Sequence, residues 1–127
     1  MSDLRRHVLV VDDEFLIVMG LTKQIEDMGL TVCGSASTAD QAVELARLHR
    51  PMVVLMDMRL DGAKDGVDAA LAINKEVGSK VIFVTGSRDP STVVRIHTDH
   101  PHAILFKPVS NQQLCDTIFA AIGLCAA

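Results

Sequence analysis

In the stretch Val8-Leu-Val-Val-Asp-Asp13, four apolar residues run directly into two carboxylates. The stretch Met52-Val-Val-Leu-Met-Asp57 has the same form, with five apolar residues before one carboxylate. Short, nearly continuous apolar runs are typical of strands that are buried on both faces of a parallel sheet. We therefore predict a parallel sheet whose strands end at charged residues.

Three further runs of this kind lie along the chain, and segments of helical length and period separate them. The predicted strands are Val8–Val11, Leu30–Ala36, Met52–Met56, Lys80–Val84 and Ala103–Phe106. The predicted helices are Glu14–Met28, Ala39–His49, Val67–Val77, Pro90–Thr98 and Asn111–Leu124. Alternating strands and helices imply right-handed crossovers, with helices on both faces of the sheet. The fold class is therefore α/β, a three-layer, doubly wound, five-stranded parallel sheet.

Residues at the predicted helix ends support these boundaries. Gly29 can end the first helix in a left-handed conformation. Ser110 and Gln113 form a capping-box pattern at the start of the last helix, and Asp89-Pro90 places a cap before a first-turn proline. The residues at the helix ends and the spacing of the apolar residues therefore indicate the same helices.

Composition narrows the possible functions. The chain has 127 residues, 49% of them apolar, which suits one domain over residues 1–127 with a core at about 7–124. Charged residues make up 22% and the net charge is −4, so the basic surface needed for direct nucleic-acid binding is not expected. The N-terminal apolar run is too short for a signal peptide or a membrane span, so we predict a cytoplasmic protein without membrane insertion. The cysteines, Cys33, Cys115 and Cys125, have no metal-site spacing and are interpreted as reduced small hydrophobes.

Polar residues that follow four of the strands carry the predicted chemistry: Asp12, Asp13, Asp57, Thr85 and Lys107. Because ligands of such sheets bind at the carboxyl ends of the strands, these side chains should meet on one rim. Three carboxylates packed together repel one another unless a cation neutralises them. An all-oxygen site suits Mg²⁺, for which Mn²⁺ can substitute.

Three of the rim residues, Asp57, Lys107 and Thr85, have roles that fit phosphoryl transfer. A carboxylate beside a divalent cation can act as nucleophile toward a phosphoryl group, and Asp57 has this position. Lys107 would pair with that carboxylate and later with a phosphoryl oxygen. Thr85 offers a hydroxyl that can donate to another phosphoryl oxygen.

Four motifs together resemble those of response-regulator receiver domains: Val-Val-Asp-Asp-Glu, Met-Asp-Met-Arg-Leu around Asp57, Val-Thr-Gly-Ser, and Phe-Lys-Pro. The resemblance covers roughly residues 7 to 124 and implies the strand order 2-1-3-4-5, for which receivers are a well-known example. It implies that the metal is bound by Asp12, Asp13, Asp57 and the backbone carbonyl of Arg59. It also implies that Asp57 is phosphorylated, that Thr85 is the switch hydroxyl, and that Lys107 pairs with the phosphoryl group. A histidine kinase or phosphotransfer protein would be the donor, and the output would pass to a downstream protein target. The chain would assist only its own phosphorylation and dephosphorylation, and would not otherwise be an enzyme.

Two regions of the chain depart from the usual receiver pattern. Asp61 and Asp65 stand where many receivers have proline and glycine, and Gly66 follows one residue late, so the loop should be one residue longer. We interpret Asp61, Lys64 and Asp65 as solvated turn residues. The alternative is that Asp61 adjusts the electrostatics at the mouth of the site. Ile104 stands three positions before Lys107, where receivers usually carry an aromatic residue. Isoleucine cannot make the ring rotation by which that aromatic residue takes part in switching. The lack of this ring, together with the motif Phe83-Val-Thr-Gly-Ser, resembles a divergent receiver subgroup.

Alternative functions make different demands on the sequence. A Mg²⁺-dependent phosphatase would need an acid two residues after the nucleophile, where Arg59 stands. A nucleotide-binding domain would need glycines after the first strand, where Glu14 and Phe15 stand. A pseudo-receiver that binds partners without phosphorylation stays an alternative, although all the expected site residues are present.

Overall fold

The computed structural model of the chain describes residues 7–60, 62, 64–86 and 102–123. Within these ranges the elements are β1 (His7–Val11), α1 (Phe15–Asp27), β2 (Thr31–Ala36), α2 (Ala39–His49), β3 (Val53–Met56), α3 (Gly66–Glu76), β4 (Lys80–Thr85), β5 (Ala103–Phe106) and α5 (Asn111–Ala121). The helix predicted over Pro90–Thr98 lies outside the described residues, as do its cap at Asp89, the turn residue Asp61, and Cys125.

The strands form one parallel sheet in the order β2-β1-β3-β4-β5, which confirms the predicted topology. In β1, Val8 is paired with Val53 of β3, and Val53 in turn with Lys80 of β4. The register continues into β5, where Ala103 is paired with Ile82. The carboxyl ends of β1, β3, β4 and β5 therefore lie along the same edge.

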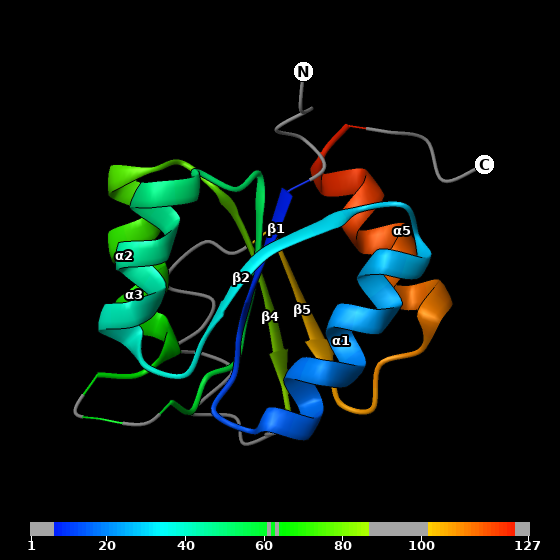
Figure 1. Cartoon of the computed structure of the whole chain (residues 1–127), viewed down its shortest axis with the longest axis horizontal. Helices are drawn as coiled ribbons and strands as arrows, with labels where there is room; N and C mark the ends of the chain where they lie inside the picture. The colour runs from blue at the N-terminus through cyan, green and yellow to red at the C-terminus, as the bar shows by residue number, and fades with distance from the viewer. Residues whose placement is uncertain (1–6, 61, 63, 87–101, 124–127) are drawn as a thin grey trace.

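Helices cover both faces of the sheet, with α1 and α5 on one side and α2 and α3 on the other (Figure 1). Successive strand side chains point to opposite faces. In β1, Val8 and Val10 accordingly belong to the core under α1 and α5, whereas Leu9 and Val11 belong to the core under α2 and α3. Strands buried on both sides explain the continuous apolar runs of the sequence.

Helix ends mostly follow the predicted chemistry. Gly29 takes a φ of 83° after α1, and the Ser110 hydroxyl accepts a hydrogen bond from the Gln113 amide at 3.1 Å. The helix α5 was predicted to reach Leu124 but ends at Ala121. Gly123 has a φ of 78°, a left-handed conformation that cannot continue an α-helix, and this is the physical reason for the earlier end.

Candidate functional site

The carboxyl edge of the sheet brings together residues from four widely separated parts of the sequence. Backbone hydrogen bonds continue the sheet for one step beyond the strands. The Asp12 amide donates to Ala36, the Asp57 amide to Val11 at 2.9 Å, and the Lys107 amide to Thr85 at 2.9 Å. The side chains that follow the strands therefore start from a rigid, shared edge.

The three predicted carboxylates lie in one cluster. Oxygen atoms of Asp12, Asp13 and Asp57 all lie within 4.8 Å of one another. Asp12 is 3% exposed and Asp57 is 7% exposed, whereas Asp13 is exposed to solvent. One oxygen of Asp12 also accepts a hydrogen bond from the Glu14 amide at 2.9 Å, which holds this carboxylate in place. The cluster thus has two buried members and one that faces water.

Lys107 bridges the two buried carboxylates. Its Nζ atom lies 2.8 Å from Oδ2 of Asp12 and 3.7 Å from Oδ2 of Asp57. Burial acts to lower the pKa of Lys107, but the hydrogen bond that Lys107 donates to Asp12 and the charge of Asp57 outweigh burial and leave this pKa raised. The lysine was expected to pair with Asp57, and its shorter contact is with Asp12. The ammonium is held in its charged form between both acids.

The carboxyl of Asp57 is the strongly perturbed acid of the cluster. Burial, followed by the like charges of Asp12 and Asp13, raises the pKa of Asp57 to about 6, although Lys107 and a backbone hydrogen bond from Arg59 oppose the shift. A cation bound among the carboxylates would remove this repulsion. Perturbed acids are concentrated at functional sites in proteins.

A cleft of about 490 Å³ opens beside the cluster, lined by Asp13, Glu14, Asp57, Arg59, Thr85 and Gly86. Thr85 closes one wall and is 2% exposed. Asp13, Glu14 and Asp57 bring carboxylate oxygens to the lining of the cleft, and Thr85 brings a hydroxyl. Hard oxygen ligands of this kind suit Mg²⁺, which retains several waters. The donor set therefore fits the predicted metal.

The loop after Asp57 packs closely against that residue, in a way that sequence patterns did not reveal. A Cβ atom on Gly66 would lie 2.0 Å from the backbone oxygen of Asp57, so only glycine fits at this position. The interpretation of Asp65 as a solvated turn residue was wrong. Its carboxylate accepts from the amides of Val67 and Asp68, and Asp68 accepts from the Asp65 amide at 3.0 Å, which makes a complete capping box for α3. The spacing of Asp65 and Asp68 is the signal that could have found it.

Ile104 occupies the position at which receivers usually carry an aromatic residue. It is paired with Phe83 across the sheet and packs half-buried against the core under α2 and α3. Phe106 lies two residues further on, so it is on the same face of β5 as Ile104. It is paired with Thr85 across the sheet. The described part of the chain thus pairs an aromatic residue with Thr85, one strand period beyond the usual position.

Comparison with known proteins gives the family. Residues 8–119 match the model of the response regulator receiver domain. Transcriptional regulatory protein PdtaR of Mycobacterium tuberculosis is 34% identical over 118 residues, which cover 93% of this chain and 57% of the relative. Phyllosphere-induced regulator PhyR of Methylorubrum extorquens is 30% identical, over 95% of this chain and 45% of the relative. The chain spans about half the length of these curated relatives.

Solved structures agree with this result. The signal receiver domain of a modulated diguanylate cyclase from Desulfovibrio desulfuricans G20 superposes with a TM-score of 0.88 and 35% identity, over 92% of this chain and 93% of that one. The receiver domain of PhyR from Erythrobacter litoralis gives a TM-score of 0.81 and 30% identity, over 92% and 89% of the two chains. The chain belongs to the response regulator receiver domain family of two-component signalling.

Among the described residues, no helix combines the length and the apolar character needed to cross a bilayer. The cytoplasmic location stays a prediction.

Proposed function

We propose that Asp57 accepts a phosphoryl group from a histidine kinase or a phosphotransfer protein, in a reaction that depends on Mg²⁺ held by Asp12, Asp13 and Asp57. The observation that carries the proposal is the position of Asp57 between the Lys107 ammonium and the open cleft. The carbonyl of Arg59 is proposed as a further metal ligand. Arg59 lines the same cleft as Asp57, which supports this assignment.

The residues of the chain have separate parts in the proposed reaction. An oxygen of Asp57 forms a bond to phosphorus while the bond from phosphorus to the donor atom breaks, and the electron pair of that bond leaves with the donor. Lys107 changes from bridging two carboxylates to pairing with a phosphoryl oxygen. Thr85 donates its hydroxyl to another phosphoryl oxygen. Bound Mg²⁺ would supply positive charge that stabilises the transferring oxygens.

We also propose protein partners, from side chains that are exposed close to the acidic cluster in sequence. Exposed apolar side chains on the first turns of α1 lie next to the acidic cluster in sequence: Phe15 is 73% exposed, Leu16 is 80% exposed and Met19 is 54% exposed. Large apolar side chains gathered on a surface mark contact sites for other proteins. A protein donor that reaches Asp57 and a downstream target are therefore the proposed partners, and the proposed role is that of a switch and not of an enzyme acting on other substrates.

Acetyl phosphate with Mg²⁺, followed by intact-mass measurement, tests the proposal. We expect the wild type to gain one phosphoryl group, and Asp57→Asn or addition of EDTA to prevent the gain. Asp65→Asn is the matched control, because asparagine also caps helices and Asp65 lies outside the acidic cluster. A wild type that binds Mg²⁺ but never gains the group would favour the pseudo-receiver alternative. Continuous release of phosphate from added phosphate esters would favour a phosphatase.

A further inference from the structure

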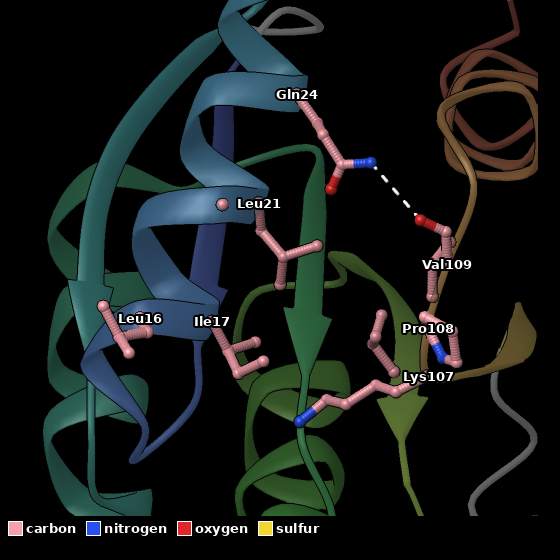
Figure 2. A pocket seen from close by; sticks show the side chains of 9 residues that line it. Leu16, Ile17, Leu21, Gln24, Lys107, Pro108 and Val109 are labelled. Carbon is pink, nitrogen blue, oxygen red and sulfur yellow. Dashed lines mark hydrogen bonds between the residues drawn. The ribbon is translucent and has the colours of Figure 1, made fainter.

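The amide of Gln24 on α1 connects this helix to the loop between β5 and α5. Its Nε2 atom donates to the backbone oxygen of Val109 at 3.3 Å and to Oδ1 of Asn111 at 2.6 Å. Figure 2 shows the first of these contacts reaching across from the helix to the loop. Asn111 is the first residue of α5, so one side chain joins α1, the loop and the next helix.

The same loop begins with Lys107. On its upstream side the Lys107 amide is anchored to Thr85 at the end of β4. On its downstream side the Gln24 contact with Val109 holds the backbone two residues after the lysine. Lys107 thus lies between two anchors, and its ammonium reaches Asp12 from this position.

Val109 packs partly buried against the core under α1 and α5, but packing does not close the space between α1 and this loop. A groove of about 370 Å³ separates them, and Gln24 and the stem of Lys107 line it at opposite ends (Figure 2). Its apolar lining is formed by Leu16, Ile17, Leu21, Val84, Pro108 and Val109. Side chains that border an open groove lack van der Waals partners on one side, so they hold the loop less tightly than a filled core would. Hydrogen bonds from Gln24 therefore carry a larger share of the positioning.

We propose that Gln24 is a positioning residue, which holds the β5–α5 loop against α1 so that Lys107 can contact Asp12 and Asp57. The inference rests on the proposed function for its effect on phosphorylation, but the position of Lys107 can be measured without phosphorylation. Gln24 does not touch the acidic cluster, so its loss should slow phosphoryl acceptance and leave Mg²⁺ affinity unchanged. A general loss of structure would change both.

Two substitutions remove the donor while differing in polarity. Gln24→Leu keeps the size and favours the helix, and Gln24→Glu keeps the shape but cannot donate to the Val109 oxygen. We expect both to change the NMR shift of Lys107 Nζ and to speed hydrogen exchange at the amides of Val109 and Ser110. With acetyl phosphate and saturating Mg²⁺, the maximal rate should fall by about tenfold, the order expected when one or two hydrogen bonds are lost.

Two further variants isolate the contact. Gln112→Leu is the matched control, since the Gln112 amide donates to Asp116 within α5 and does not contact the loop. Asn111→Asp retains an acceptor for Gln24 and should behave like the wild type. Unchanged Lys107 Nζ shift and amide exchange in both Gln24 variants would overturn the inference. If the wild type gains no phosphoryl group, the proposed function fails, and the Lys107 shift still decides the role of Gln24.

Discussion

At the scale of single residues, the charge of Asp57 opposes folding. The pKa of its carboxyl is about 3.9 in an unfolded chain, and burial beside Asp12 raises this pKa to about 6 in the folded protein. Between these values the folded state holds the proton more tightly than the unfolded state does. The free energy of unfolding therefore falls as pH rises through this interval and stays lower above it.

Asp57→Asn removes this charge. In Mg²⁺-free buffer we expect it to raise the free energy of unfolding by about 2 kcal/mol at about pH 7, and by close to nothing at about pH 4, because the wild-type carboxyl is then neutral in the folded state. Urea unfolding curves at both pH values measure the difference. An equal effect at the two pH values would show that charge is not the cause.

At the scale of elements, the start of α3 determines how closely the chain returns to Asp57. Gly66 permits the close approach, and the capping box of Asp65 and Asp68 begins the helix at that point. The spacing of the glycine and the two acids was visible in the sequence. The contact that requires the glycine was not visible, because it joins the helix to a backbone oxygen of the preceding strand end.

Alanine at two glycines should have opposite effects. Gly66→Ala places a methyl group against the Asp57 backbone and is expected to lower the free energy of unfolding by more than about 2 kcal/mol. Gly20 lies inside α1 with nothing near its missing Cβ, so Gly20→Ala should stabilise by about 0.5–1 kcal/mol through helix propensity. Chemical denaturation of both variants tests this. A destabilised Gly20→Ala variant would contradict the open space on that face.

At the scale of the whole molecule, the parallel sheet gathers the carboxylates on one edge, and a cation bound there should stabilise the folded chain. At ten times its Kd, Mg²⁺ should add about 1.4 kcal/mol to the free energy of unfolding, because the unfolded chain lacks the assembled site. Thermal unfolding with and without Mg²⁺ measures this. Asp13→Ala should lose most of the effect, whereas Lys107→Ala should keep it.

Lys64→Ala provides the control for removal of a positive charge, since Lys64 pairs with Asp40 on the exposed surface and these two residues line a different cleft from the one that Asp57 lines. It should respond to Mg²⁺ as the wild type does. If Asp13→Ala also keeps the full stabilisation, the carboxylate cluster is not the site of Mg²⁺ binding.

For the part of the chain that the structure describes, the sequence by itself determined the order of strands and helices, the fold class and the rim on which Asp12, Asp57 and Lys107 meet. All three follow from local features of the sequence, because a short apolar run predicts each strand and the polar residue after it marks where the strand ends. Only the tertiary structure decided that Lys107 lies closer to Asp12 than to Asp57, that Gly66 packs on the Asp57 backbone, and that Gln24 holds a loop 85 residues away. Such contacts depend on distances and on exclusion of water between segments remote in sequence, and no local pattern encodes them.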